Sequence, residues 1–494
     1  MKKSQPKINR GIGILPMRHG LEAHATLKTG AAFHFIGICG TAMGSVAAAL
    51  RERGFTVTGS DEKIYPPMST FLEKKGIALH EGYRAENIPD AADIVVIGNA
   101  MKRGNPEVEE VLNRKLYYTS LPEVLKELFL RGRHNLVVTG THGKTTTTAL
   151  LAWIMTSAKL DPGYLIGGIP KNLGQGARLS DSKYFVIEGD EYDSAFFDKR
   201  SKFVHYLPEL LIVNNIEFDH ADIFRDLDEI KLSFRRLLNI LPQNGMLLLN
   251  GDDPHCVEVL QQVQPFLAQI EEVGFSPNCA RQIRDVTYSA DGSRFTLGDE
   301  KFEVPLIGEF NVRNAAMAIS AARFYGVPVA KIKKALASFE GIARRQEVRG
   351  EARGIKVIDD FGHHPTAIRE TLRALRHRYP GSRIWAIFEP RSNTTRRAIF
   401  QQDLPDALQL ADGVFISRVA CLDQIPENER LNPEAVVKAI AASGKPAFYE
   451  PNVAHIIERL VPLLKKKDIV AIFSNGGFDG IHGRLLATLA ALKS

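Results

Sequence analysis

The residues best suited to chemistry form a short loop near the middle of the chain, 139–146, which reads Thr-Gly-Thr-His-Gly-Lys-Thr-Thr. Apolar residues 136–138 precede this loop and apolar residues 149–155 follow it, so the pattern predicts a strand, a loop and a helix. Glycines let backbone N–H groups approach a phosphate, and a helix N-terminus favours anions. We expect Lys144 to reach terminal phosphates from a surface position. Only two residues separate the glycines, against four in the common phosphate loop. The strand, loop and helix order still favours an ATP site over a glycine turn with an unrelated lysine.

Acidic residues and a histidine follow two further predicted strands. Residues 184–187 lead into the acidic run Glu188 to Asp193, and residues 210–216 lead to His220. Carboxylate oxygens suit Mg²⁺, and the hydroxyl of Thr145 can join a magnesium shell. The alternatives are a solvated acidic turn and a packed histidine. Their position beside the ATP loop favours a magnesium site.

Two asparagines precede a predicted alanine-rich helix over residues 315–325. Asn311 and Asn314 are three residues apart, so they share one face of its first turn. They suit the polar edge of a nucleotide, and they also suit a helix N-cap pair without further function. Beyond them, strands and helices alternate, and loops 359–365 and 475–480 follow strands, where open parallel sheets bind ligands.

The amino-terminal third begins as a strand, a glycine loop and a helix. Residues 31–36 are apolar except for His34, the loop 37–44 contains three glycines, and a second strand at 55–58 leads to Asp61. Cys39 stands where a dinucleotide-binding loop has its second glycine, so a dehydrogenase is disfavoured. The loop either holds a diphosphate or is a structural turn.

The bulk composition indicates an ordinary globular protein. The chain has 494 residues, 44% of them hydrophobic, and a formal net charge of +6, which suits anionic substrates without implying nucleic acid. Four scattered cysteines suggest reduced thiols in a cytoplasmic protein. No apolar run approaches a membrane span, so we expect no membrane insertion.

We therefore predict an α/β fold of three domains after a flexible arm at residues 1–30. The predicted domains are a Rossmann-like UDP-binding domain at 31–132, a P-loop ATPase-like domain with a parallel sheet at 133–340, and a Rossmann-like C-terminal domain at 341–494. We expect a monomer or a weak dimer.

Taken together, the motifs resemble the Mur ligases, which build the cytoplasmic precursor of bacterial cell-wall peptide. The resemblance runs from about residue 33 to the C-terminus. The segments that carry it, in order, are 139–146, 188–193, 215–220, 308–314, Arg344-Arg345 and 359–365. The first glycine loop and segment 359–365 resemble the branch that uses UDP-N-acetylmuramate.

The resemblance implies an ATP- and Mg²⁺-dependent amide ligase. It would join the murein tripeptide L-alanyl-γ-D-glutamyl-meso-diaminopimelate to UDP-N-acetylmuramate through an acyl phosphate, in cell-wall peptide recycling. The segments 188–203, 388–394 and 474–478 favour the tripeptide as the amine. The alternative within the family is a UDP-N-acetylmuramate–L-alanine ligase. A non-catalytic nucleotide-binding regulator with the same fold is a second alternative. A folate-type glutamate ligase, against which the UDP-type first domain argues, is a third.

The resemblance also implies roles for individual residues. The catalytic group would be Lys144, Glu188 and His220. Thr145 would be a ligand of one Mg²⁺, and Glu188 and His220 would be ligands of a second. ATP would contact Gly140, Thr141, His142, Gly143, Lys144, Thr145, Thr146, Asn311, Asn314, Arg345 and Asp360. The UDP substrate would contact Gly37, Gly40, Thr41, Ser60, Asp61, Asn99 and Asn172. The amine substrate would contact His363, Arg391 and Asn475. Several family members carry a carbamoylated lysine after the histidine, for which Lys231 is either the candidate or a helix-surface residue.

Overall fold

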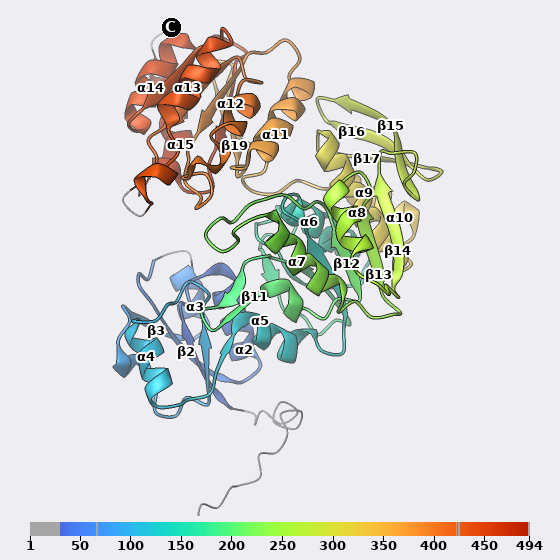
Figure 1. Cartoon of the computed structure of the whole chain (residues 1–494), viewed down its shortest axis with the longest axis vertical. Helices are drawn as coiled ribbons and strands as arrows, with labels where there is room; N and C mark the ends of the chain where they lie inside the picture. Colours follow the sequence, from blue (N-terminus) through green and yellow to red (C-terminus); the bar gives the residue numbers. More distant parts are fainter. Residues whose placement is uncertain (1–29, 66–67, 421, 423–424, 493–494) are drawn as a thin grey trace, which may run out of the picture.

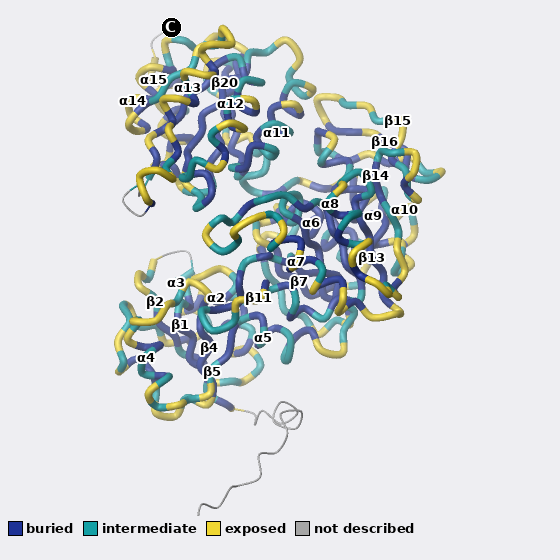
Figure 2. The backbone as a smooth tube through the Cα atoms, in the orientation of Figure 1, coloured by how far each residue is buried: buried dark blue, intermediate teal, exposed yellow. Residues whose placement is uncertain are grey.

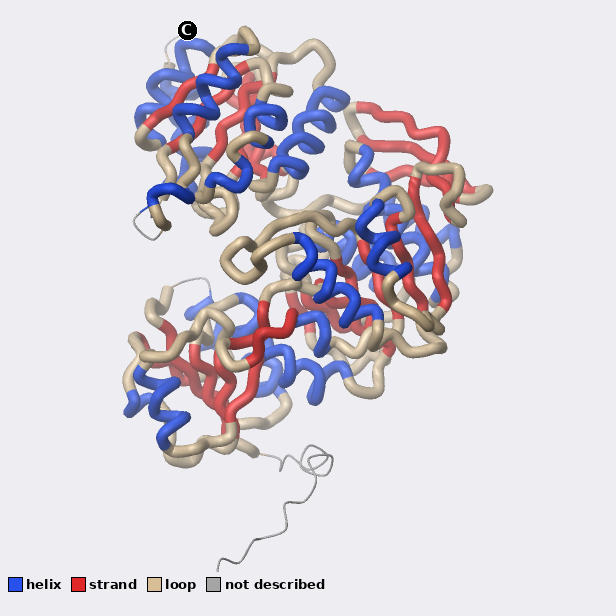
Figure 3. The backbone as a smooth tube through the Cα atoms, in the orientation of Figure 1, coloured by secondary structure: helices blue, strands red, loops and turns tan. Residues whose placement is uncertain are grey.

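The computed structural model describes residues 30–65, 68–420, 422 and 425–492, so the arm predicted at residues 1–30 lies outside the described residues except for Gly30. Figure 1 shows three lobes, an amino-terminal one in blue, a central one in green and yellow, and a C-terminal one in orange and red. Each lobe is built on its own sheet, with the strands buried between helices (Figures 2 and 3). In the described part of the chain, no helix combines the length and the apolar character that crossing a membrane requires.

The amino-terminal unit contains a parallel five-stranded sheet in the order β3-β2-β1-β4-β5. Its strands are β1 (Ala32–Ile36), β2 (Thr56–Asp61), β3 (Ala78–Glu81), β4 (Ile94–Ile97) and β5 (Tyr118–Ser120). Its helices are α2 (Thr41–Glu52), α3 (Met68–Lys74), α4 (Pro106–Asn113) and α5 (Leu121–Leu125), with a π-helical turn at Lys126–Leu130. Apolar residues on one face of β1 and on α2 form its core, which continues under the central sheet.

The central unit contains a ten-stranded sheet in the order β17-β16-β15-β14-β13-β12-β6-β9-β7-β8. Its strands are β6 (His134–Thr139), β7 (Gly163–Leu165), β8 (Ala177–Arg178), β9 (Tyr184–Glu188), β12 (Leu210–Val213), β13 (Met246–Asn250), β14 (Gln269–Gly274), β15 (Arg281–Ser289), β16 (Gly292–Leu297) and β17 (Glu300–Val304). Its helices are α6 (Lys144–Ser157), α7 (Leu227–Leu238), α8 (Pro254–Gln261), α9 (Glu309–Phe324) and α10 (Val329–Ala337). The predicted parallel sheet is present, with antiparallel pairs at both edges, β15 with β16, β16 with β17 and β7 with β8.

The C-terminal unit contains a six-stranded sheet in the order β18-β19-β23-β20-β21-β22, parallel except for the edge strand β18. Its strands are β18 (Glu347–Ala352), β19 (Ile355–Asp360), β20 (Ile384–Phe388), β21 (Gly413–Ser417), β22 (Ala447–Glu450) and β23 (Ile469–Phe473). Its helices are α11 (Pro365–Arg378), α12 (Asp403–Leu408), α13 (Pro433–Ala442), α14 (Val453–Leu460) and α15 (Ile481–Ala491). Apolar clusters fill both faces of this sheet, as expected for parallel strands flanked by helices.

A hairpin of the central unit reaches the amino-terminal unit. Strands β10 (Asp193–Ala195) and β11 (Asp198–Ser201) pair antiparallel just after the acidic run that follows β9. At its tip, Phe197 packs edge-on against Tyr118 of β5 with ring centroids 4.9 Å apart. The acidic run is therefore tied to the position of the amino-terminal sheet.

Candidate active site

The order of three neighbouring parallel strands explains why the predicted site residues converge. Strand β6 lies between β12 and β9, and all three run in the same direction. Their carboxyl ends therefore meet at one edge of the sheet. The predicted phosphate loop, residues 139–146, follows β6, the acidic run follows β9, and the segment with His220 follows β12.

The glycines of the phosphate loop are required by its backbone. Gly140 has φ of +123° and Gly143 has φ of +81°, where side chains with a Cβ atom are disfavoured. A Cβ on Gly140 would lie 2.9 Å from the backbone nitrogen of Asn215, and one on Gly143 would overlap the side chain of Asn314. Helix α6 begins at Lys144, earlier than the apolar pattern predicted, so its N-terminus faces the loop.

The expectation that Lys144 occupies a surface position was wrong. Its side chain is 13% exposed, and its Nζ lies 2.9 Å and 2.8 Å from the two carboxylate oxygens of Glu191. Nζ also donates to the carbonyl of Gly140 at 2.7 Å. Burial alone would lower the pKa of Lys144, but the carboxylates of Glu191 and Asp190 raise it. The lysine is thus held charged at the start of α6.

Glu188 and Thr145 form an oxygen pair beside this lysine. The Thr145 hydroxyl donates to Glu188 Oε1 at 2.9 Å, and the Gly167 N–H donates to Glu188 Oε2 at 2.6 Å. Burial raises the pKa of Glu188, although Lys144 opposes the shift. A divalent cation would stabilise the ionised carboxylate at this position, and these hard oxygen donors fit Mg²⁺.

His220 is joined to the same cluster through Glu191. Its Nε2 lies 2.9 Å from Glu191 Oε1, and its backbone has φ of +57°. Glu191 therefore bridges Lys144 and His220, a role that we did not predict for it. Its place in the acidic run after β9 was the only signal in the sequence.

Residues of α9 and of the C-terminal unit complete the site. Helix α9 begins at Glu309 with Gly308 as its N-cap, so the alternative of Asn311 and Asn314 as an N-cap pair was wrong. Asn311 donates to the carbonyl of Ile307 at 2.9 Å.

Asp360, at the end of β19, accepts from the backbone N–H groups of Gln346 and Gly362 at 2.9 Å and 2.7 Å, and burial raises the pKa of its carboxyl group. Arg345 crosses between the units and donates to the Thr145 hydroxyl at 3.3 Å.

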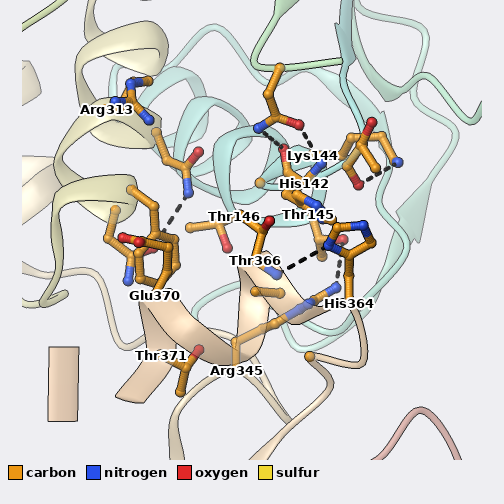
Figure 4. Close-up of a pocket in the computed structure, with 18 of the residues that line it drawn as sticks. His142, Lys144, Thr145, Thr146, Arg313, Arg345, His364, Thr366, Glu370 and Thr371 are labelled. Carbon is orange, nitrogen blue, oxygen red and sulfur yellow. Dashed lines mark hydrogen bonds between the residues drawn. The ribbon is translucent and has the colours of Figure 1, made fainter. Parts of the chain in front are cut away.

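These groups surround one cavity of about 480 Å³ between the central and C-terminal units. Figure 4 shows Lys144 and Thr145 of α6 facing Arg345, His364 and Thr366, with Arg313 of α9 further along the wall. The predicted residues that line the cavity are Thr141, His142, Gly143, Lys144, Thr145, Thr146, Glu188, His220, Asn311, Asn314, Arg345, Asp360 and His363. Gly140 lies next to the lining, in the same loop.

The residues predicted for UDP lie apart from this cavity. The N–H groups of Gly37 and Ile38 donate to the carbonyl of Ser60, and Cys39 N–H donates to Asp61 Oδ2 at 2.8 Å, so the glycine loop is fastened to the end of β2. Ser60 is fully buried, its hydroxyl donates to Glu107 and its carbonyl is already engaged by the loop, so the structure exposes no part of Ser60 for the predicted contact with UDP. Helix α2 brings Gly40 and Thr41 to the same edge of the amino-terminal sheet as Asp61, and Asn99 is exposed after β4.

Asn172, which was also predicted to contact UDP, belongs to the central unit. Its side-chain amide donates to the carbonyl of Ser338 and accepts from the N–H of Glu340.

Two residues predicted for the amine substrate lie beside one another, outside the cavity lining. The Arg391 side chain covers Gly476, where a Cβ would overlap it, and is half-exposed. The Oδ1 atom of neighbouring Asn475 is buried and has no hydrogen-bond partner among the described residues. Lys231 is 7% exposed and pairs with Glu258 at 2.6 Å. It is therefore not a helix-surface residue, and it does not line the cavity.

Sequence reasoning also missed a polar contact that joins the two units. His142 and Thr366 both bind Glu217 Oε2, at 3.4 Å and 2.8 Å. His364 accepts from Thr366 N–H through Nδ1 and lies 3.2 Å from the carbonyl of Phe218 through Nε2. His142, Glu217 and His364 are close enough for a metal cluster, with one atom of each within 4.8 Å of the others. Their ligand atoms are already engaged by protein groups, so the cluster acts as a hydrogen-bonded contact between the units.

Acid should weaken this contact. Burial and the charge of His142 lower the pKa of His364 from 6.5 to about 3. Between these values the unfolded chain binds a proton that the folded chain does not. Stability therefore falls as pH falls through this window, by roughly 2 kcal/mol at pH 5. His364→Asn keeps an acceptor for Thr366 N–H without this titration. Its melting temperature should fall less than that of the wild type between about pH 7 and pH 5, and parallel changes would contradict the assignment.

The fold and the cavity define a nucleotide-dependent enzyme of three α/β units, and the comparisons with known proteins give its family. Family models match the chain in succession, "Mur ligase family, catalytic domain" at residues 32–133, "Mur ligase middle domain" at 138–322 and "Mur ligase, glutamate ligase domain" at 344–476. The chain belongs to the Mur ligase family, whose members are ATP-dependent ligases that form amide bonds.

Individual relatives narrow the comparison. The UDP-N-acetylmuramate–L-alanyl-γ-D-glutamyl-meso-2,6-diaminoheptandioate ligase of Escherichia coli (strain K12) is 45% identical, over 92% of this chain and 98% of its own. The crystal structure of a murein peptide ligase from Psychrobacter arcticus superposes with a TM-score of 0.70 at 39% identity, over 94% of this chain and all of that one. A UDP-N-acetylmuramate–L-alanine ligase from Acetivibrio thermocellus is 34% identical, over 90% of this chain and 93% of its own.

Proposed function

We propose that this protein joins the tripeptide L-alanyl-γ-D-glutamyl-meso-diaminopimelate to UDP-N-acetylmuramate, with conversion of ATP to ADP and phosphate. The observation that carries the proposal is the cavity in which Lys144, Glu188 and His220 of the central unit face Arg345 and Asp360 of the C-terminal unit. The higher identity to the tripeptide ligase than to the L-alanine ligase supports the tripeptide as the amine.

The reaction follows from the chemistry of an acyl phosphate. A lactyl carboxylate oxygen of UDP-N-acetylmuramate attacks the γ-phosphorus of ATP, and ADP leaves. The α-amine of the tripeptide alanine then attacks the activated carbonyl carbon, loses a proton, and expels phosphate as the amide forms. Such chemistry depends on positioning and on neutralising charge, because each step brings anionic groups together.

The residues of the cavity suit this task. Lys144 and Arg345 supply positive charge for the β- and γ-phosphates, and the N-terminus of α6 supplies backbone donors. Asp360, Asn311 and Asn314 line the side on which the nucleoside is expected. Thr145, Glu188 and His220 would hold Mg²⁺, which neutralises phosphate and acyl-phosphate charge when bound. The glycine loop of the amino-terminal unit and Asp61 would hold the UDP part.

The amine should be recognised through its carboxylates near Arg391. The guanidinium is half-exposed and lies over Gly476, beside the unsatisfied Oδ1 atom of Asn475. Arg391→Ala should raise the tripeptide KM by about ten- to a hundredfold, because a charge-assisted contact is worth about 1.5–3 kcal/mol. The KM values for ATP and UDP-N-acetylmuramate should stay unchanged. An equal rise for all three substrates would remove Arg391 from the amine site.

A phosphate-release assay tests the proposed function. The chain is given ATP, Mg²⁺ and UDP-N-acetylmuramate together with either the tripeptide or L-alanine. Rapid release with the tripeptide and slow release with L-alanine is the expected result. The reverse preference would establish the L-alanine ligase instead, and no release with either amine would support a nucleotide-binding regulator without catalysis.

A further inference from the structure

The segment that carries His220 is held by a loop of the C-terminal unit. This loop, residues 389–397, follows β20, and the His220 segment lies between β12 and α7 in the green part of the central lobe (Figure 1). The Thr394 hydroxyl donates to Asp219 Oδ1 at 2.7 Å and accepts from the Ala221 N–H at 3.3 Å. Thr394, which is 1% exposed, therefore binds the residues on both sides of His220 through a single hydroxyl.

The backbone of His220 needs such support. Its φ of +57° is in the left-handed region, which is disfavoured for a residue with a Cβ atom and persists only where the surroundings enforce it. The carboxylate of Asp219 accepts from the His220 N–H at 2.7 Å through the same Oδ1 atom that Thr394 binds. Hydrogen bonds thus connect the strained backbone of His220, the Asp219 carboxylate and the Thr394 hydroxyl.

The orientation of the His220 ring depends on this backbone. In the supported conformation its Nε2 lies 2.9 Å from Glu191, the carboxylate that also binds Lys144. A second contact strengthens the same junction, because Asn393 donates to Asp222 Oδ2 at 2.8 Å. Release of the segment would let the backbone relax and turn the ring away from Glu191.

We infer that Thr394 is a positioning residue. It lies on the C-terminal side of the junction between the units, and it holds His220 of the central unit in the reactive arrangement, in which the His220 Nε2 atom faces Glu191. This inference rests on the proposed function. Its consequence is that the central unit does not hold its own histidine in place alone, since Thr394 comes from the C-terminal unit. The reactive arrangement is completed only when the two units are in contact, which confines the acyl phosphate to a closed site.

Three substitutions in the full-length chain test this inference. Thr394→Val removes the hydroxyl at nearly constant volume, and Thr394→Ser keeps the hydroxyl. Thr395→Val is the matched control, because the adjacent Thr395 is also buried but, among the residues that the structure describes, its hydroxyl binds only Ser392 of its own loop. The kcat and KM of phosphate release are measured with the tripeptide. The ring signals of the histidines are recorded by NMR after labelling with ¹³C-histidine, with His220→Gln to assign the signal of His220.

We expect Thr394→Val to lower kcat at least tenfold with KM for UDP-N-acetylmuramate unchanged, and to shift or broaden the His220 signal. Thr394→Ser should restore kcat to within threefold of the wild type, and Thr395→Val should change neither quantity. A Thr394→Val kcat within twofold of the wild type, equal losses in the valine and serine variants, or an unmoved His220 signal would each overturn the inference. If the wild type releases no phosphate with either amine, the proposed function fails, and the NMR comparison still decides whether Thr394 positions His220.

Discussion

Lys144→Ala should lower kcat by about 10³-fold or more, because phosphoryl transfer depends on positive charge placed against the transferred group. Lys144 is the cation at the N-terminus of α6, where it donates to the carbonyl of Gly140 and to both oxygens of Glu191. Steady-state phosphate release measures the effect. Activity within tenfold of the wild type would contradict the ATP-loop assignment.

The same substitution should also destabilise the fold, because Lys144 is buried in an ion pair. Loss of the cation leaves Glu191 buried with His220 as its remaining partner, and breaking such a pair costs about 3 kcal/mol. The double variant Lys144→Ala/Glu191→Gln removes both charges and separates the two effects. It should recover most of the stability in urea unfolding and none of the activity. If the double variant also recovered activity, the activity lost in the single variant would be due to its lower stability and not to the missing charge of Lys144.

Glu188→Gln should lower kcat by about a hundredfold or more while UDP-N-acetylmuramate still binds. An amide is a weaker ligand for Mg²⁺ than a carboxylate. Glutamine also cannot accept from both Thr145 and Gly167 as Glu188 does, because its NH₂ group would face one of the two donors.

A magnesium titration of phosphate release separates Glu188→Gln from a general defect. The variant should require a higher Mg²⁺ concentration for half-maximal rate, and calorimetry should give an unchanged dissociation constant for UDP-N-acetylmuramate. If Glu188→Gln turned over at the wild-type rate in limiting Mg²⁺, the acidic run would be a solvated surface turn and not a magnesium site.

The fold could be read from the sequence because its strands are continuous apolar runs of the kind that parallel sheets bury. Residues 31–36 and 184–187 were predicted as strands, and the structure has β1 at Ala32–Ile36 and β9 at Tyr184–Glu188. Helix starts were less accurate. Helices α6 and α9 begin with polar residues, which the structure uses for the cavity and for contacts with neighbouring loops, so their apolar pattern starts a turn late. The antiparallel edge strands β16 and β17 were not predicted, because pairing at a sheet edge leaves little periodic signal.

The lining of the cavity was predictable where its residues form a local pattern in the sequence. A phosphate loop, or an acidic run after a strand, has a local pattern, and its residues do line the cavity. The contacts between units have no such pattern. Glu217 and His364 are 147 positions apart, and Asp219 and Thr394 are 175 apart. Their pairing follows from how two separate sheets meet, which no local spacing encodes. Even the burial of Lys144 depends on Glu191, a residue of another strand end.

The central claim is an acyl phosphate formed on UDP-N-acetylmuramate and captured by the tripeptide, and transfer of oxygen isotope tests it most directly. UDP-N-acetylmuramate is labelled with ¹⁸O in both oxygens of its lactyl carboxylate and incubated with ATP, Mg²⁺ and the tripeptide. The masses of the products are then measured by mass spectrometry. We predict one ¹⁸O atom in the released phosphate, one retained in the new amide, and turnover with L-alanine far below that with the tripeptide. Phosphate without label, or labelled phosphate formed faster with L-alanine than with the tripeptide, would contradict the claim.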